Sequence, residues 1–462
     1  MNKVTVGLEV HAQLLTQTKL FCGCKIDWQA SQNSLVCPVC MGMPGTLPVL
    51  NKRAVEFAIK SALALNCSVN TTSIFSRKNY FYPDLPKGYQ ITQYDKPIAQ
   101  NGFIMVNNRK IRIRRVHLEE DAGKSIHTDK ETLVDFNRCG VPLIEIVTEP
   151  DIESSAEAVE YLMKLRQILR YIGVCTGDME KGNMRCEPNI SVNRGNRTEI
   201  KNLNSFKAVS KGIDYEFQRQ TKALENNEQV THVTLLWDEK EEVTKPMRTK
   251  ETSEDYRYFP EPDLPPLVLK ESWIEEIKAT LPELPETKIS RFVNQYGVPE
   301  QDAKILCEEQ VMADYYESAV KVCNLPKQTA NFIISDLLAV MNTLQTSLEK
   351  LTFSPAYTAE LLSLIENGII TRKTAKDILP ELIEKQESPA KFVEAKGLKQ
   401  ISGGDEIENA VKKVLSQYPE EVERYKQGKV QLFAFFTGKV MQETKGKANP
   451  QAIKDLLLKN LS

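Results

Sequence analysis

The chain has 462 residues of ordinary globular composition, 41% hydrophobic and 26% charged, and a formal net charge of −2. From this length we expect two or three domains. The near-zero net charge excludes nucleic-acid binding through overall charge, so any such contact must use a local basic surface. No run approaches the roughly 20 apolar residues that span a bilayer, and the first ten residues lack signal-peptide features, which predicts a cytoplasmic protein without membrane contact.

The N-terminal part combines short strand patterns with helices. In the first strand pattern, apolar residues at positions 4, 6, 8 and 10 alternate with other residues, so Glu9 and His11 project together from the opposite face. Further strand patterns have the β-branched and apolar content of strands, and they lie at 111–121, 132–136, 142–149, 187–193 and 231–237.

A helix is predicted over 155–172, where Ser154 and Glu157 form a capping-box pattern before apolar residues at helical spacing. The proline-rich segment 259–266 forces extended backbone and indicates a connector. From about residue 272 the pattern is almost wholly helical, with a glycine break at 402–404. The fold class expected is α+β, a sheet domain followed by an all-α domain and a small helical tail domain, with boundaries at 1–290, 291–400 and 401–462.

Four cysteines lie in one short loop, spaced as C-x-C, twelve residues, and C-x₂-C: Cys22, Cys24, Cys37 and Cys40. Four thiolates at this spacing can complete a tetrahedral zinc shell and leave no position open for water. We therefore expect a structural Zn²⁺ site in a loop at about 20–42, which is too poor in apolar residues to order itself. Four reduced cysteines in a compact loop are the alternative, and zinc ribbons also occur in nucleic-acid binders that catalyse nothing.

Several predicted strands offer acidic or imidazole side chains, namely Glu9, His11, Glu119, Glu120, Asp121, Glu145 and Glu187. Glu145 lies in an apolar strand, where a carboxylate is costly unless it is paired or ligates a cation. Hard oxygen ligands on a rigid sheet suit Mg²⁺, although each acid taken singly can be a salt-bridged or solvated residue. The period of two puts Glu120 with Leu118 and Glu119 with Asp121, and the pattern alone does not choose between these faces, because a bulge would exchange them.

The sequence lacks the signature of a phosphate loop and those of known amidases. Residues 122–125 resemble the end of a phosphate loop, but Leu118 stands where its first glycine belongs, so we exclude a P-loop. The sequence contains no G-x-S-x-G elbow and no convincing Ser/Lys or Cys/His amidase arrangement. This chain is therefore not expected to hydrolyse glutamine itself.

Longer motifs occur in a fixed order along essentially the whole chain. They are Gly7-Leu-Glu-Val-His11, Gly42-Met-Pro-Gly-Thr-Leu-Pro-Val-Leu-Asn51, Arg77-Lys-Asn-Tyr-Phe-Tyr-Pro-Asp84, Lys87-Gly-Tyr-Gln90, His117-Leu-Glu-Glu-Asp-Ala-Gly-Lys124, the segment 134–151, Glu199-Ile-Lys-Asn-Leu-Asn-Ser-Phe206 and Asp255-Tyr-Arg-Tyr-Phe-Pro-Glu-Pro-Asp263. The chain resembles the B-subunit family of the glutamine-dependent aspartyl/glutamyl-tRNA amidotransferases. This resemblance implies an antiparallel-sheet cradle domain, similar to glutamine synthetase and guanidino kinases, then a helical domain and a tail that grips tRNA.

The resemblance also implies an activity. In this family, the B subunit uses ATP to phosphorylate the side-chain carboxylate of Glu on tRNA(Gln) or of Asp on tRNA(Asn). Ammonia from an amidase A subunit then displaces the phosphate, and a small C subunit holds the pair together as a heterotrimer. The chain would thus belong to a carbon–nitrogen ligase that uses ATP, Mg²⁺ and Zn²⁺. A noncatalytic tRNA-binding scaffold within the same complex is the alternative, and the sequence does not choose between the two tRNA substrates.

Site residues follow from the matched motifs. The resemblance implies that Mg²⁺ is held by His11, Glu120 and Glu145 with Glu9 beside them, so it favours Glu120 over Glu119. The same ligands and Glu187 would face the nucleotide. The candidates for phosphate contacts are Lys78, Lys87 and Arg138. Lys78 is also assigned a catalytic role. Each of the three can instead be a solvent-facing cation.

The chain departs from the family pattern at three places. Glu187-Pro188 replaces Asp-Ala, Val233 and Leu235 replace an acid and an arginine, and the segment 434–441 differs in several residues. These departures keep the scaffold alternative open. Near the C-terminus, lysines supply sequence-independent attraction to phosphate, so tRNA would be recognised by shape through Lys439, Lys445 and Lys447, unless they form a solvated helix face.

Overall fold

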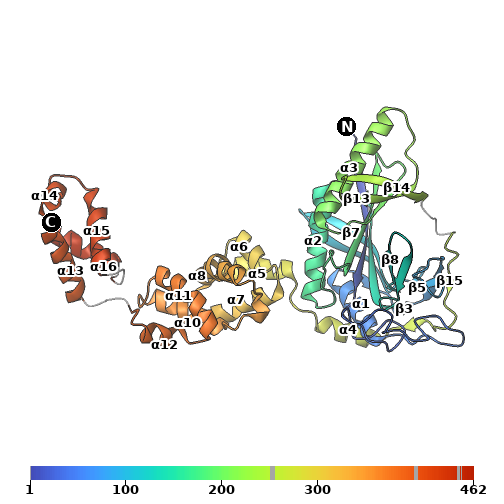
Figure 1. The fold of residues 1–462 in the computed structure, drawn as a ribbon, viewed down its shortest axis with the longest axis horizontal. Helices are drawn as coiled ribbons and strands as arrows, with labels where there is room; N and C mark the ends of the chain where they lie inside the picture. Colours follow the sequence, from blue (N-terminus) through green and yellow to red (C-terminus); the bar gives the residue numbers. More distant parts are fainter. Residues whose placement is uncertain (1, 250–254, 400–403, 445–447, 449, 462) are drawn as a thin grey trace. The chain divides into compact units, whose positions relative to one another are not determined.

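The computed structural model describes residues 2–249, 255–399, 404–444, 448 and 450–461 (Figure 1). The chain divides into two compact units, Met1–Pro285 and Glu286–Ser462. Among the described residues, no helix has both the length and the apolar character that a membrane crossing requires. The three predicted domain ranges stay predictions.

A nine-stranded sheet forms the centre of the first unit, in the order β14-β13-β12-β11-β1-β10-β7-β6-β2. Every neighbouring pair is antiparallel except β12 with β13, which is parallel. The strands are β1 (Val4–Gln13), β2 (Ser68–Val69), β6 (Ala99–Val106), β7 (Arg109–Glu120), β10 (Pro142–Thr148), β11 (Met184–Val192), β12 (Thr198–Lys201), β13 (Val233–Asp238) and β14 (Val243–Thr249). The large, mostly antiparallel sheet confirms the mixed fold expected from the sequence, whereas the likeness to glutamine synthetase and guanidino kinases stays a prediction.

Helices cover one side of this sheet and short strands lie on the other (Figure 1). The covering helices are α1 (Lys52–Ala64), α2 (Ser155–Tyr171) and α3 (Phe206–Glu225). On the other side, a three-stranded sheet has the order β15-β4-β5, and two further pairs form, β16 with β3 and β8 with β9. These strands are β3 (Thr72–Ser73), β4 (Phe75–Asn79), β5 (Tyr89–Gln93), β8 (Lys124–His127), β9 (Thr132–Asp135), β15 (Phe259–Pro260) and β16 (Leu267–Val268).

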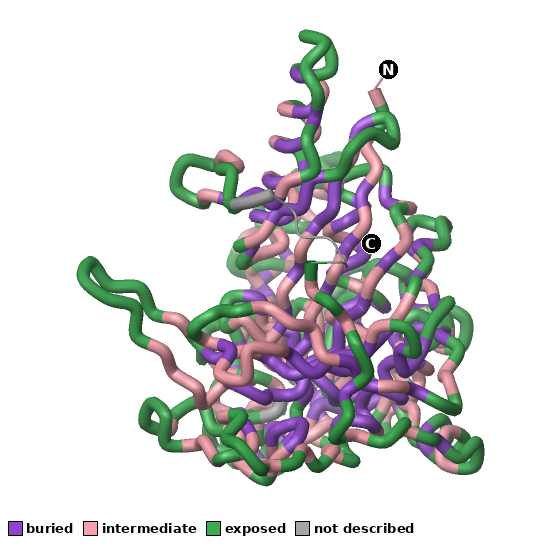
Figure 2. The backbone as a smooth tube through the Cα atoms, turned by 90° about the vertical axis from the view of Figure 1, so that its right-hand side faces the viewer, coloured by how far each residue is buried: buried purple, intermediate pink, exposed green. Residues whose placement is uncertain are grey.

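The alternation of β1 determines which side of the sheet is apolar. Val6, Leu8, Val10 and Ala12 are almost completely buried in one core cluster with residues of α1, α2 and α3, and burying each larger side chain contributes about 1.5–3 kcal/mol. The intervening residues of β1 face away from these helices. Figure 2 shows buried segments gathered in the middle of the view and exposed segments in the loops that project from it. The sheet therefore has an apolar helix side and a polar side.

The start of α2 follows the sequence signal with one difference. The hydroxyl of Ser154 accepts a hydrogen bond from the backbone N of Glu157 at 3.1 Å, as an N-cap should. The Glu157 carboxylate, however, accepts from the backbone N of Glu153 at 2.8 Å and pairs with Arg109. The predicted helix is thus confirmed, and its acidic residue ties the helix to β7 instead of closing a capping box on Ser154.

After α4 (Glu271–Ala279), the described chain is helical, as the sequence predicts. The second unit contains two clusters of buried apolar residues, one within 292–393 and one within 407–461. Its elements are α5 (Pro285–Tyr296), α6 (Glu300–Leu306), α7 (Gln310–Cys323), α8 (Pro326–Phe332), η1 (Ile333–Leu337), α9 (Leu338–Thr343), η2 (Leu348–Lys350), α10 (Pro355–Glu366), α11 (Arg372–Lys385), α12 (Pro389–Ala395), α13 (Gly404–Gln417), α14 (Pro419–Lys426), α15 (Leu432–Glu443) and α16 (Pro450–Leu461).

Candidate functional site

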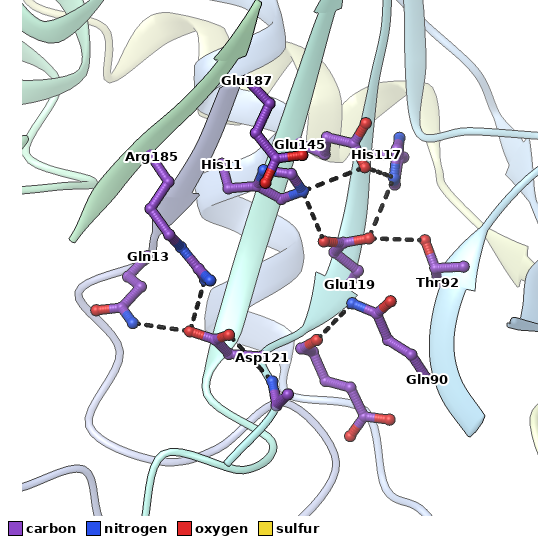
Figure 3. A network of polar contacts seen from close by, with 12 residues as sticks. His11, Gln13, Gln90, Thr92, His117, Glu119, Asp121, Glu145, Arg185 and Glu187 are labelled. Carbon is purple, nitrogen blue, oxygen red and sulfur yellow. Dashed lines mark hydrogen bonds and ion pairs between the residues drawn. The ribbon is translucent and has the colours of Figure 1, made fainter. Parts of the chain in front are cut away.

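Two histidines and two glutamates converge where β1, β10 and β7 run side by side (Figure 3). His11 lies opposite Glu145 in the strand register, and Glu145 lies opposite His117. His11 Nε2 is 3.3 Å from Glu119 Oε1 and 3.5 Å from Glu145 Oε2. His117 Nε2 is 3.0 Å from Glu145 Oε2. Residues opposite one another on neighbouring strands share a face, so the register brings these four side chains together.

Three of these residues form a candidate cation site. His11, Glu119 and Glu145 each offer one ligand atom, and these atoms lie within 4.8 Å of one another. Two carboxylates supply the hard oxygen ligands that Mg²⁺ prefers, and imidazole is a common ligand of divalent metals. Both glutamates are buried, and a buried carboxylate needs a positive partner. The residues therefore fit a divalent cation, with Glu119 in the place that the resemblance gave to Glu120.

The imidazoles and carboxylates shift one another's pKa values in opposite directions. Burial lowers the pKa of His11, but hydrogen bonds and charge from Glu119 and Glu145 raise it well above its ordinary value. Burial raises the pKa of Glu145, but His117 and His11 lower it well below its ordinary value. A metal ligand must be an unprotonated imidazole, so a cation that binds here displaces a proton from His11.

Glu120 lies outside this group in the structure, whereas the resemblance places it beside His11. Its Oε1 accepts a hydrogen bond from the backbone N of Ile91 at 2.9 Å and pairs with the ammonium of Lys87. No register shift interrupts β7 between residues 116 and 120, so alternation puts Glu120 on the opposite face from Glu119. The Mg²⁺ ligand role of Glu120 and the phosphate contact of Lys87 stay predictions, and in the structure these two side chains pair with one another.

A cavity of about 70 Å³ lies on the Glu120 side of β7. Its lining includes Lys19, Cys40, Lys87, Glu120 and Asp263. The cavity therefore borders the four-cysteine loop and the Lys87–Glu120 ion pair, and the three candidate cation ligands are not part of its lining. It is a polar space separate from the candidate cation site.

The ammonium of Lys78 on β4 lies near the candidate cation site and forms no ion pair among the described residues. Its ammonium lies 4.6 Å from the centroid of the Tyr256 ring. Burial lowers the pKa of Lys78, but Glu119 and Glu145 raise it above its ordinary value, so the ammonium stays charged at neutral pH. Within the described chain, Lys78 makes contacts with aromatic rings and no ion pair with a carboxylate. Its charge is available to an anion such as phosphate.

A second acidic group lies beside the first on β1, β11 and β12. Glu9, Glu187 and Glu199 each offer an oxygen within 4.8 Å of the others. Lys201 Nζ lies 2.6 Å from Glu187 Oε2 and 3.6 Å from Glu199 Oε1, and Asn189 donates to Glu9 at 3.0 Å. Burial raises the pKa of Glu187, but Lys201 lowers it to about 2. The longer side chain of Glu187 thus still brings an ionised carboxylate to the polar face.

Asp121 binds several polar side chains at one end of the polar face (Figure 3). It accepts from Gln13 Nε2 at 2.9 Å and pairs with Arg185 Nη2 at 2.8 Å. Burial raises the pKa of Asp121, but Arg185 and Arg138 lower it below its ordinary value. Arg138 also donates to the carbonyls of residues 122 and 123, at 3.0 and 2.6 Å. Arg138, predicted to contact phosphate, is therefore engaged with its own loop and Asp121.

Four residues that contact these groups were not among the sequence candidates: His117, Arg185, Glu199 and Lys201. His117 and Arg185 each stand two residues from a candidate acid on their own strand, Glu119 and Glu187, so strand alternation was the available signal. Their partners lie on other strands, however, and only the register between strands identifies them.

The four cysteines lie together as the spacing predicts. Their sulfurs lie within 4.8 Å of one another. The completely buried Lys19 places Nζ 3.6 Å from Cys40 Sγ and donates to the carbonyl of Phe136 at 3.2 Å. A hydrogen bond from Cys22, together with the charge of Lys19, lowers the pKa of Cys40 to about 4. Four converging sulfurs fit a tetrahedral Zn²⁺ site.

The predicted tRNA contacts lie in the C-terminal part. Lys439 belongs to α15, and its ammonium lies 5.4 Å from the Tyr418 ring centroid and 5.7 Å from that of Phe435. Lys445 and Lys447 lie outside the described residues. The divergent segment 434–441 lies within α15 and contributes buried residues to the last apolar cluster. A role in tRNA binding stays a prediction.

The departures on β13 lie on the helix side of the sheet. Thr234 donates to Glu199 Oε2 at 3.1 Å and so faces the second acidic group. Its neighbours Val233 and Leu235 project the other way by alternation, as does the buried Trp237, which meets the ring of Tyr215 on α3. The substitutions at positions 233 and 235 therefore do not remove side chains from the polar face.

The fold and the site together define a mixed α/β protein that carries a candidate divalent-cation centre on the polar side of a large sheet. Residues 4–275 match the GatB/GatE catalytic domain family, and residues 314–461 match the GatB domain family. The chain belongs to the B-subunit family of the aspartyl/glutamyl-tRNA(Asn/Gln) amidotransferases, which confirms the resemblance seen in its motifs.

Relatives from three bacteria share nearly their full length with this chain. The aspartyl/glutamyl-tRNA(Asn/Gln) amidotransferase B subunit of Thermodesulfovibrio yellowstonii is 50% identical over 470 residues, 99% of each chain. The protein of the same name from Thermotoga maritima is 49% identical over 473 residues, 99% of this chain and 98% of the relative. That of Persephonella marina is 50% identical over 463 residues, 98% of each chain.

Proposed function

We propose that this chain activates the side-chain carboxylate of Glu-tRNA(Gln), Asp-tRNA(Asn) or both, as the ATP-dependent component of a glutamine-dependent tRNA amidotransferase. The names of its relatives supply the amidotransferase and the tRNA. The convergence of His11, Glu119 and Glu145 beside an uncommitted Lys78 is the observation that supports the phosphoryl-transfer chemistry. An amidase and a small third protein, the A and C components of the complex, would complete a heterotrimeric ligase, and its cytoplasmic location stays a prediction.

The chemistry requires activation because a carboxylate is a poor electrophile at neutral pH. A carboxylate oxygen attacks the γ-phosphorus of ATP, the bond to the β-phosphate oxygen breaks, and ADP leaves. The nitrogen of ammonia then attacks the carbonyl carbon of the acyl phosphate, the carbon–oxygen bond breaks, and inorganic phosphate leaves with the proton that the nitrogen loses as the amide forms. Mg²⁺ held by His11, Glu119 and Glu145 would neutralise charge on the phosphate oxygens.

The protein's own residues have distinct tasks in this proposal. His11 and Glu145 come from adjacent strands whose register fixes their spacing, so the ligands are preorganised. His117 contacts Glu145 at 3.0 Å and holds the orientation of that carboxylate. Lys78 supplies a positive charge for the transferred phosphoryl group, because its ammonium is charged and forms no competing ion pair among the described residues.

The alternative is a noncatalytic tRNA-binding scaffold. One departure that keeps it open leaves the charge of the polar face intact, because Glu187 retains a carboxylate in the second acidic group. Val233 and Leu235 lie on the side of β13 away from that group. The scaffold and the enzyme differ in one measurable property, which is ATP turnover that depends on mischarged tRNA.

A phosphate-release assay separates the two functions. The chain is assembled with its amidase and small partners and given γ-labelled ATP with Glu-tRNA(Gln) or Asp-tRNA(Asn). The proposal expects labelled phosphate only when a mischarged tRNA is present, and a Glu145→Gln variant should lose this release. A complex that binds tRNA and releases no phosphate with either substrate would establish the scaffold instead.

A further inference from the structure

Arg115 stands on the polar face of β7 close to the candidate cation site. It lies opposite Val147 of β10 and Gln100 of β6 in the strand register. His117 follows two residues later, about 7 Å along the strand, and no register shift separates Arg115 from His117. Alternation therefore puts the side chains of Arg115, His117 and Glu119 on the same face.

The guanidinium of Arg115 lacks the partners that its neighbours have. Its Nε is buried without a hydrogen-bond acceptor, and within the described chain Arg115 forms no ion pair. A buried donor without an acceptor is costly, so the Nε of Arg115 is free to donate to a bound anion. The other arginines of β7 are satisfied by carboxylates: Arg109 by Glu157, Arg112 by Asp151 and Arg114 by Glu149.

An aromatic pair lies within electrostatic reach of Arg115. Tyr258 stacks on Tyr94 with ring centroids 4.1 Å apart and an interplanar angle of 6°. Burial and the charges of Glu119 and Glu145 raise the pKa of Tyr258, whereas Arg115 lowers it, so Tyr258 lies near both the acids and the guanidinium. Aromatic rings offer stacking surfaces to nucleobases, and the planar guanidinium matches phosphate with two parallel hydrogen bonds.

We propose that Arg115 is a substrate-binding residue that holds a phosphate attached to adenosine. This inference rests on the proposed function, in which two ligands bring such a phosphate to the polar face: ATP, and tRNA with the phosphodiester of its 3′-terminal adenosine. The position of Arg115 beside His117 puts the bound phosphate next to the cation site. Lys78 and Arg115 thus have separate anions to bind, the transferred phosphoryl group and a phosphate that stays on its nucleotide.

Equilibrium binding to the assembled amidotransferase tests this role without requiring turnover. ATP and Glu-tRNA(Gln) are titrated separately against the wild type, Arg115→Gln and Arg115→Lys. Arg115→Gln should weaken binding of one of the two ligands by about tenfold to hundredfold, because a charge-assisted bidentate contact is lost. A loss of affinity for ATP assigns the phosphate to the nucleotide, and a loss of affinity for the tRNA assigns it to the terminal phosphodiester. Arg115→Lys should recover part of the affinity, since an ammonium lacks the planar fork.

Arg112→Gln is the matched control, because it removes an arginine from the same strand that is already paired with Asp151. This variant should bind both ligands as the wild type does. Wild-type affinity of Arg115→Gln for both ATP and tRNA would overturn the inference. Should Arg115→Gln fail to fold, Arg115→Lys decides: unchanged affinity for both ligands overturns the role, and a loss for one supports it. A wild type that binds both ligands and transfers no phosphate would refute the proposed function alone.

Discussion

The two candidate metal groups of this protein are built in opposite ways. The four-cysteine group comes from one loop, so all its ligands lie within 19 residues of sequence, from Cys22 to Cys40. The imidazole–carboxylate group takes His11 from β1, Glu119 from β7 and Glu145 from β10. The first depends on local spacing and the second on the register of three strands. A locally encoded group is recognisable from spacing, whereas one assembled across a sheet requires knowledge of which residues face one another.

The largest effect expected from this contrast is loss of zinc from the loop. In Cys37→Ser, three sulfurs remain of a site whose metal binding contributes apparent free energies of about 10 kcal/mol or more in small zinc peptides. We expect the variant to lose bound zinc and the loop to become sensitive to protease, as measured by metal analysis and limited proteolysis. Cys67→Ser, a buried cysteine outside the loop, should keep the metal. One zinc per chain in purified Cys37→Ser would contradict the assignment.

The second prediction separates Glu119 from Glu120. Glu119→Gln removes a charged ligand, and we expect phosphoryl transfer to fall about thousandfold, because metal-based charge stabilisation is worth several kcal/mol. Glu120→Gln should retain the affinity for Mg²⁺, although it leaves Lys87 without its carboxylate partner. Single-turnover phosphate release and calorimetric titration with Mg²⁺ measure the two effects. Loss of Mg²⁺ binding in Glu120→Gln alone would reverse the assignment made from the strand alternation.

The third prediction concerns Lys78, whose ammonium forms no ion pair among the described residues. Lys78→Met should weaken the use of ATP by about tenfold to hundredfold, since one hydrogen bond to a charged group is removed. Lys78→Arg should keep part of the activity because it keeps the charge. Lys110→Met provides the comparison, because Lys110 is exposed and lies 3.9 Å from the centroid of the Phe103 ring. Steady-state kinetics with ATP varied measures the effect, and equal kinetics for Lys78→Met and Lys110→Met would exclude Lys78 from the site.

The smallest effect is the pH dependence of Mg²⁺ affinity. The pKa of His11 lies well above its ordinary value, so at neutral pH its imidazole holds a proton that the cation must displace. Below the raised pKa, affinity should therefore increase by about tenfold for each unit rise in pH, and it should level off above that pKa. Titrations with Mg²⁺ at several pH values measure this slope. An affinity that does not change with pH would show that His11 is not a ligand.

The sequence predicted the parts of the site that depend on one segment. The alternation of β1 put Glu9 and His11 on one face, and the structure places both on the polar side with other acids. The spacing of the cysteines predicted their convergence. The capping pattern at Ser154 located the start of α2. Each of these inferences uses residues that are close in sequence, where geometry follows from the repeat of the secondary structure.

The parts that the sequence did not predict depend on pairing between segments. The choice of Glu120 over Glu119 followed the resemblance, whereas in the structure it is Glu119 that contacts His11. Lys87 and Arg138 have the charge that a phosphate requires, but their partners, Glu120 and Asp121, neutralise them in the folded chain. The residue type gives a side chain's capacity to bind an anion, and only its neighbours determine whether that capacity is free.

A single extra residue in β7 governs the orientation of the part of that strand that carries His117 and Glu119. The pairing with β10 shifts between Val147 and Thr148, which means that β7 contains a bulge at this point. In a regular strand, residues buried on one face are an even number of positions apart. Ile113 before the bulge and Val116 after it are both buried, although they are three positions apart. Removing one residue there would rotate the rest of the strand by half a repeat and turn His117 into the apolar core. The strand therefore tolerates substitutions far more readily than a change in its length.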